Sequence, residues 1–388
     1  MNDEISSDKS QRKQWRILWT LILITAGIIA AMILFITTPL KNYVGLEEVL
    51  NFGFNKQEEV DPNGQLPDNG EEKKPQYFNP LSGEPVETLA EATRRPLAIM
   101  VASDVDTRPQ SGLSEAEWVF EMPAGRGVMT RLMPVYIEKD PKELGSLRSS
   151  RHDFVEIAKG LDALYAHWGG SYLAYNKYLT AGFVDNLDVM RYPDANGFYR
   201  VNRLYAPHNG FADPKELRKI AKEKGYKTTT DLKSYRFFAE DDYPVDRPTE
   251  GELFVGQPGN FAVTYKYNGK SNSYSRYYGS QPHIDYNTNK TIEVENVIIM
   301  RTTWYLPRQD QQYVEIDLEG EGAADFYRNG QRTQGVWKKA TPSSELRFYY
   351  GPKKDKEVPL MPGQTWVHVI ATNIPVAWTT PEIENQPL

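Results

Sequence analysis

The sequence of 388 residues contains no cysteine. This absence excludes disulfide bonds, thiolate metal sites, a cysteine nucleophile and a lipid-modified N-terminal cysteine. The sequence also has no excess of basic residues, and its formal net charge is −7 at pH 7. Because binding to duplex nucleic acid depends on positive charge, we expect no nucleic-acid partner. The residues that are present, 40% hydrophobic and 25% charged, are typical of a folded protein.

Several familiar catalytic motifs are absent as well. The sequence has no H-E-x-x-H zinc motif, no Walker phosphate loop and no G-x-G-x-x-G dinucleotide motif. S-x-x-K occurs only in the N-terminal tail and K-T-G does not occur, which excludes the serine site of penicillin-binding proteins. The sequence therefore predicts no metal and no cofactor, and it leaves open whether the protein is an enzyme.

One segment is long and apolar enough to span a membrane. Residues 17–36 carry no charged side chain, and as a helix they would span roughly 30 Å, the thickness of a bilayer core. A cleaved signal peptide usually has a shorter apolar region, of about 7–15 residues, followed by small residues. Because basic residues precede this run, the positive-inside rule predicts a single-pass anchor in the cell membrane, with a cytoplasmic tail (1–16) and an extracytoplasmic body.

The rest of the chain divides by composition into a linker and two predicted domains. Residues 37–77 include a stretch rich in charge, Pro, Asn and Gly, which predicts an extracytoplasmic linker. Alternating strand and helix signals predict a mixed α/β domain over 78–240. Alternating apolar residues without a substantial helix predict a smaller, β-rich domain over 250–385. The expected fold class is α+β.

Local signals place the expected elements within these domains. Buried strands are expected at 96–102, 128–138, 161–167, 261–267, 314–318 and 365–370. Helices are expected to begin at Ser150, Ser171 and Asp213. The S-E-A-E sequence at 114–117 matches a capping box and predicts another short helix. Asn-Gly pairs at 268–269 and 329–330 predict type I′ hairpin turns.

Two arginines stand where a helix should begin. Arg148 and Arg151 flank two serines, although cations are disfavoured at a helix N-terminus by about 0.3–1 kcal/mol each. An anion held between them and the backbone N–H groups would explain this placement. The alternative is a pair of surface arginines bridged to neighbouring carboxylates.

A strand-to-helix turn follows, with the sequence H-W-G-G-S. Gly169 and Gly170 allow close backbone approach and can direct N–H groups at a ligand. Ser171 is either the N-cap of the next helix or a hydroxyl nucleophile. His167, at the end of a buried strand, is either an acid/base or a structural histidine.

A third polar cluster lies at 200–209. It contributes Arg203, His208 and Asn209 beside a turn, and His208 could converge with His167 and Asp185 on one site. Two histidines and a carboxylate are also a minimal metal set, but their spacings match no recognised signature. Arg108, in an R-P-Q-S-G sequence, is either a further anion contact or part of a plain turn.

These segments together resemble the YerB-like family of exported bacterial proteins. The matching stretches are RPLAIMVASD (95–104), RPQSGLSEAEWVFE (108–121), TRLMPVYIEKDPKELGSLRSSR (130–151), DALYAHWGGS (162–171) and APHN (206–209), with further matches to about residue 370. The resemblance implies a mixed α/β domain followed by a smaller β-rich one. Many members look like lipoproteins, and this sequence departs from them by its missing cysteine and its apolar anchor.

The resemblance implies no reaction, because the function of the family is unknown. A fainter similarity to the LytR–CpsA–Psr wall-polymer transferases lacks their Arg-Asp pair. We therefore expect a membrane-anchored envelope protein that binds an anionic ligand, such as a wall polymer or a lipid-linked precursor. The alternatives are a wall-polymer phosphotransferase or glycan-cleaving enzyme, and an adaptor for a protein partner in an envelope or sporulation complex.

Overall fold

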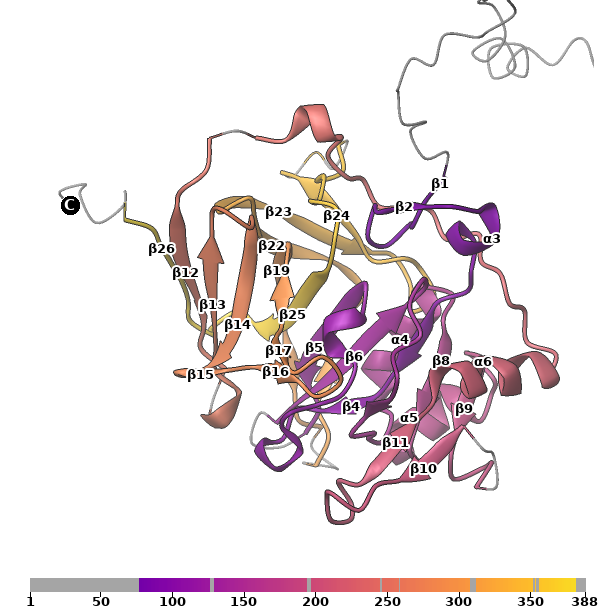
Figure 1. Cartoon of the computed structure of the whole chain (residues 1–388). Helices are drawn as coiled ribbons and strands as arrows, with labels where there is room; N and C mark the ends of the chain where they lie inside the picture. Colours follow the sequence, from indigo (N-terminus) through magenta and orange to yellow (C-terminus); the bar gives the residue numbers. More distant parts are fainter. Residues whose placement is uncertain are drawn as a thin grey trace, which may run out of the picture. The chain divides into compact units, whose positions relative to one another are not determined.

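Strands make up most of the described part of the chain, and helices are few and short (Figure 1). The computed structural model describes residues 77–381 except 126–128, 194–196, 245, 258, 308–311, 352 and 354–355. The predicted tail, membrane anchor and almost all of the linker lie outside these residues. Within the described residues, no helix has the length and apolar character needed to cross a bilayer.

The larger of two main sheets is built from both halves of the chain. Its strands are β3 (Leu97–Ile99), β4 (Val101–Ala102), β5 (Trp118–Pro123), β6 (Thr130–Tyr136), β8 (Leu164–His167), β9 (Asn186–Asp188), β19 (Asn296–Thr302), β22 (Gly320–Arg328), β23 (Gln331–Lys339), β24 (Arg347–Tyr350) and β25 (Thr365–Ala371). Their order is β24-β23-β22-β19-β25-β5-β6-β3-β8-β9, with β4 beside β6. Hydrophobic clusters cover both faces, so β5 and β6 are buried along their whole length.

The smaller main sheet comes from the second half of the chain alone. Its strands are β12 (Glu250–Val255), β13 (Val263–Asn268), β14 (Ser273–Tyr278), β15 (Gln281–Pro282), β18 (Glu293–Val294) and β26 (Val376–Thr379). Alternate residues such as Leu253, Tyr265 and Tyr274 are buried in one cluster with Val297 and Ile299 of β19. This alternation is what a sheet with one buried face requires.

The two segments predicted as separate domains share the larger sheet. β25 lies between β19 and β5 and runs parallel to both strands. Thr365 stands opposite Asn296 on one side and opposite Trp118 on the other. Residues Lys73–Leu388 accordingly group into one compact unit. The boundary near residues 240–250 thus separates two segments of the sequence but not two separate sheets. Both segments contribute strands to the larger sheet.

A buried ion pair joins the two main sheets. Glu121 on β5 and Arg276 on β14 are 2.8 Å apart, and both side chains are fully buried. Arg276 also donates to the hydroxyl of Tyr265 over 3.1 Å and contacts His283. Trp366 Nε1 donates to the Glu121 carboxylate over 3.1 Å. Burial alone would raise the pKa of Glu121, but the charge of Arg276, together with His368 and the hydrogen bonds from Thr130 and Trp366, outweighs burial, and the pKa of Glu121 is lowered.

Four α-helices lie within the described residues, and most gather beside β8 and β9 (Figure 1). They are α3 (Leu89–Ala92), α4 (His152–Gly160), α5 (Tyr172–Ala174) and α6 (Pro214–Glu223), and α5 continues as a π-helical turn, η4 (Tyr175–Leu179). The expected start of α6 is confirmed, since the Asp213 side chain accepts from Lys215 N over 2.8 Å and Pro214 occupies the first turn.

Short elements complete the described structure. They are β1 (Tyr77–Phe78), β2 (Pro85–Val86), β7 (Leu144–Gly145), β10 (Phe198–Arg200), β11 (Gly210–Ala212), β16 (Ile284–Asp285), β17 (Lys290–Thr291), β20 (Trp304–Tyr305), β21 (Glu315–Ile316) and the 3-10 turns η2 (Val105–Thr107), η3 (Leu113–Glu115), η5 (Glu240–Asp242) and η6 (Gly259–Phe261).

Two local predictions need correction. The capping box predicted at 114–117 is wrong: a 3-10 turn forms there, and Glu117 is buried and accepts from the N–H groups of Ile137 and Glu138. The Asn-Gly pair at 268–269 opens a longer loop before β14, whereas the pair at 329–330 forms the expected two-residue hairpin, with positive φ at both residues.

Candidate functional site

Three buried arginines converge near the start of α4, and we call them the arginine cluster: Arg131, Arg148 and Arg151. Arg131 lies on β6, Arg148 follows β7, and Arg151 is the residue before α4. Each is less than one-tenth exposed. Arg148 and Arg151 were predicted to share an anion site, whereas Arg131 was not predicted to belong to it.

Most of the hydrogen-bond partners of the cluster are neutral main-chain carbonyl groups. Arg148 donates to the Pro207 carbonyl over 2.7 Å, and Arg131 donates to the Ser149 carbonyl. Arg151 donates to the carbonyls of Ser150 and Ala124 over 2.9 and 3.0 Å. These bonds fix the guanidinium groups without neutralising their charge. The alternative of a surface pair bridged to neighbouring carboxylates does not fit, because both side chains are buried.

Carboxylates compensate little of this positive charge. Within the described residues, the ion pair of the cluster is that of Arg148 Nε with Asp104, at 3.8 Å. Asp153, the nearest acid along α4, holds its proton at neutral pH because burial raises its pKa to about 8. Burial and then the charges of Arg151 and Arg148 lower the pKa of Arg131 well below its usual value. The cluster thus carries a net positive charge that an anion would relieve.

His208 reaches the cluster, as the sequence suggested. Its Nδ1 atom contacts the guanidinium group of Arg148. Because arginine can only donate, Nδ1 accepts and the ring proton resides on Nε2 in this arrangement.

The Gly-Gly turn runs beside the cluster, but its hydrogen bonds serve the fold. Ser150 N donates to the Gly169 carbonyl over 2.8 Å, and Ser171 N donates to the Ser150 carbonyl over 3.0 Å. The Gly169 N–H donates to the buried Asp188 over 2.9 Å, so this amide is not offered to an anion. A Cβ added at Gly170 would lie 3.2 Å from a ring carbon of Tyr175, a tight contact that favours glycine there.

His167 and Asp185 do not converge as predicted. β8 and β9 are parallel, with His167 opposite Asp188, so Asp185 lies beyond the other end of the pair and accepts from Arg95 over 2.7 Å. His167 is fully buried, its Nδ1 bonds the Gly169 carbonyl over 2.8 Å, and burial lowers its pKa. These contacts favour the structural interpretation of His167.

Ser171 is the N-cap of α5. Its hydroxyl oxygen accepts from Ala174 N over 3.1 Å, and the residue is 1% exposed. The cap accounts for a serine at this position, and a hydroxyl held in this way does not favour the nucleophile interpretation.

The other predicted ligand contacts are occupied within the protein. Arg203 pairs with Glu143, and Arg108 lies 3.3 Å over the Tyr278 ring and donates to main-chain carbonyls. Asn209 accepts from Arg200 over 2.5 Å. Across the described residues, no three His, Asp or Glu side chains have an arrangement that could hold a metal ion.

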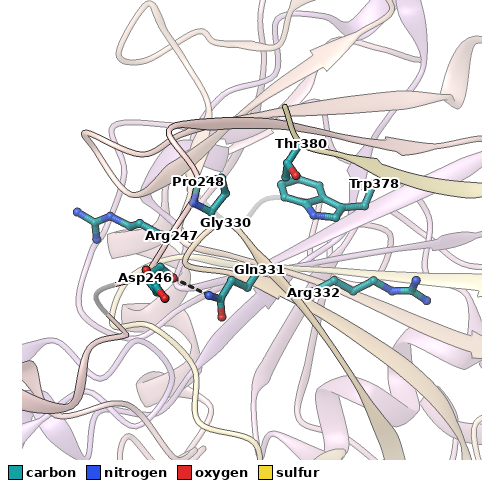
Figure 2. Close-up of a pocket in the computed structure, with 8 residues that line it drawn as sticks. All are labelled: Asp246, Arg247, Pro248, Gly330, Gln331, Arg332, Trp378 and Thr380. Atoms are coloured by element: carbon teal, nitrogen blue, oxygen red, sulfur yellow. Dashed lines mark hydrogen bonds between the residues drawn. The ribbon is translucent and has the colours of Figure 1, made fainter. Parts of the chain in front are cut away.

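A cavity of about 790 Å³ opens elsewhere, in the second half of the chain (Figure 2). It is lined by Asp246, Arg247, Pro248, Gly330, Gln331, Arg332, Trp378 and Thr380. Figure 2 shows the side chains of Arg247 and Arg332 pointing apart, and Arg332 pairs with Asp325 over 2.8 Å. Its cations therefore do not converge on one ligand position, unlike those of the arginine cluster.

Two family models match the chain and together cover most of it. They are "Protein of unknown function (DUF3048) N-terminal domain", over residues 81–227, and the corresponding C-terminal domain, over 254–367. The chain belongs to the DUF3048 family. Together with the relatives of this chain, these matches confirm the resemblance to YerB-like proteins drawn from the sequence.

This DUF3048 protein is similar to a curated protein and to a solved structure. "Putative lipoprotein YerB" of Bacillus subtilis (strain 168) is 30% identical over 294 residues, covering 75% of this chain and 85% of the relative. The crystal structure of YerB protein from Bacillus subtilis matches with a TM-score of 0.68 and 25% identity, covering 79% of this chain and all of the solved chain. The common fold therefore includes both segments of the body.

Proposed function

We propose that this protein is an exported, membrane-anchored envelope protein whose folded body binds an anionic ligand at the arginine cluster. The observation that carries the proposal is three buried guanidinium groups with a single, long ion pair among the described residues. Retaining mutually repelling buried cations is costly unless a ligand compensates them. A phosphate-bearing wall polymer or a lipid-linked precursor has the required charge.

Because a relative is named as a lipoprotein, we place this protein at the membrane as well. Its attachment to the membrane must differ from that of a lipoprotein. A lipoprotein is held by a lipid on cysteine, and this sequence has none. The uncharged run at 17–36 supplies the alternative, with the basic flank on its cytoplasmic side.

Topology is tested by protease treatment of intact protoplasts. A tag at residue 1 should survive, and an epitope placed after residue 381 should be lost, because the body lies outside the membrane. Permeabilised cells, in which both epitopes should be cleaved, serve as the control. Survival of the C-terminal epitope in intact protoplasts would show that the predicted orientation is wrong.

Anion binding is tested by the effect of inorganic phosphate and pyrophosphate on thermal unfolding of the purified full-length chain. A ligand of the folded state raises the midpoint, so both anions should raise it more than chloride at equal ionic strength. Arg148→Gln should weaken the affinity about tenfold or more, since a charged hydrogen bond is worth about 1.5–3 kcal/mol. Arg148→Lys should retain part of it, because the charge remains while the guanidinium fork is lost.

Arg203→Gln provides the matched control. Arg203 is paired with Glu143, so its loss should leave the phosphate response unchanged. Equal responses to phosphate and chloride, or an unaltered response in Arg148→Gln, would refute the anion site and favour the adaptor alternative.

A further inference from the structure

A second cavity, of about 320 Å³, lies at the start of α4. Its walls come from the first turn of α4, from η4 and from the segment around β21, so both halves of the chain contribute. Lining side chains include His152, Asp153, Glu156, Lys177, Tyr178 and Glu315. None of them was selected from the sequence.

Polar atoms in this cavity are buried without partners. Both ring nitrogens of His152 and the Oδ2 atom of Asp153 lack a hydrogen-bond partner among the described residues, although His152 Nε2 lies 3.4 Å from Asp153 Oδ1. Each of these two residues is only 2% exposed. Buried polar groups are nearly always satisfied, so these atoms are available to form hydrogen bonds with a molecule that enters the cavity.

The rest of the cavity is held rigidly. Asp153 Oδ1 accepts from Ile316 N over 3.0 Å, and the Tyr178 hydroxyl donates to Glu156 over 2.7 Å. Tyr178 and Lys177 come from the π-helical turn η4. Such turns are rare and occur frequently at functional sites.

Charges around the cavity favour a cation. Lys177 and Glu315 neutralise each other at 2.8 Å, and Lys339 stands 3.9 Å from Glu156. Asp317 and Glu319 add two further carboxylates to the wall. Arg151, which precedes His152, is the opposing positive neighbour, but its guanidinium group bonds carbonyls of the arginine cluster. The acidic wall therefore exceeds its positive partners.

We propose that this cavity binds the primary ammonium group of a small hydroxylated or linear amine, with the nitrogen donating to Asp153 and Glu156. His152, with one ring nitrogen donating and the other accepting, meets a neighbouring hydroxyl or amine of the ligand. As the ammonium group arrives with its three protons, the Asp153 carboxylic acid releases its own proton to the buffer. This inference is independent of the anion site.

The protonation states fit this exchange. Burial raises the pKa of Asp153 to about 8, and nearby Glu156 adds to the shift. Burial likewise raises the pKa of Glu156, whereas burial and then Lys177 lower the pKa of His152 to about 4. At neutral pH the cavity thus presents a neutral acid and a neutral imidazole, and a bound cation would favour ionised Asp153.

Calorimetric titration of the purified full-length chain tests the proposal, with D-glucosamine and 1,5-diaminopentane as probes. N-acetyl-D-glucosamine and D-glucose are the neutral controls. Near neutral pH, one of the amines should bind at least about tenfold more tightly than the neutral sugars and release up to about one proton, measured in two buffers of different ionisation enthalpy. The preferred amine distinguishes an amino-sugar source from a linear side chain.

Two carboxyl variants make the outcome decisive. Asp153→Asn should abolish proton release and weaken amine binding about tenfold or more. Glu295→Gln is the control, because Glu295 is a partly buried acid whose pKa burial also raises, to about 7, and it does not line the cavity. Binding of neither amine, equal binding of N-acetyl-D-glucosamine, or unchanged proton release in Asp153→Asn would overturn the proposal.

Discussion

Replacing Arg276 by methionine is expected to lower the free energy of unfolding by about 3–5 kcal/mol. The substitution leaves Glu121 as a buried charge without its cation, and both side chains of the pair are fully buried. It also removes the donor to the Tyr265 hydroxyl. Since whole domains are stable by only about 5–15 kcal/mol, the variant should unfold at a much lower urea concentration than the parent chain.

Two further variants separate the charge effect from general disruption. Adding Glu121→Gln to Arg276→Met should restore part of the loss, because no buried charge then remains unpaired. Lys219→Met, which breaks the exposed Lys219–Glu216 pair of α6, should change the free energy by less than about 0.5 kcal/mol. If Arg276→Met costs no more than Lys219→Met, the buried pair does not contribute as argued.

Replacing Asp153 by asparagine should stabilise the protein increasingly as the pH rises from about 4 to about 8. In the unfolded chain this carboxyl ionises near pH 3.9, whereas burial raises its pKa in the folded state to about 8. Between these values the folded state binds the extra proton, so parent stability falls as pH rises, by up to about 1.4 kcal/mol per pH unit. Asparagine carries no such cost, and its Oδ1 can still accept from Ile316 N.

The measurement is urea unfolding of both chains across this pH range. The two free energies should differ least at and below about pH 4, where the parent carboxyl is protonated in the folded state and becomes protonated in the unfolded chain as well, and should diverge above it. Asp140→Asn is a useful comparison, because Asp140 pairs with Arg218 and Arg94, and its loss should destabilise the protein at neutral pH. A constant difference between the Asp153→Asn and parent chains would contradict the pH argument.

Helix starts and turns could be predicted from the sequence where a single short motif determines the local backbone conformation. The Asp-Pro start at 213–214 gave α6, and the Asn-Gly pair at 329–330 gave a two-residue hairpin. These features depend on backbone and capping chemistry within a few residues. The Ser-x-x-Glu sequence at 114–117 carried the same kind of signal, but the fold uses Glu117 to hold the backbone at 137–138.

The candidate sites depended on contacts that sequence order conceals. Arg148 and Arg151 were found because cations are unusual at a helix start, but Arg131 lies in an apolar strand. A charge inside a run such as T-R-L-M-P-V was the available signal. Asp185 was the acid predicted to lie near His167, whereas Asp188 stands opposite His167, because the register of β8 and β9 is not encoded locally. The unpaired atoms of His152 and Asp153 become visible only once the segment around β21 is packed against α4.

The position of β25 has a consequence for how the protein is made. β5 reaches its parallel neighbour only when residues 365–371 have been synthesised, so a nascent chain released from the ribosome at residue 250 would expose one edge of a strand that is buried along its whole length in the complete protein. Exposed edges of this kind invite pairing with other chains. Secretion of the first family segment alone is therefore expected to yield aggregates, and an export pathway that holds the chain unfolded until its last strand arrives suits this topology.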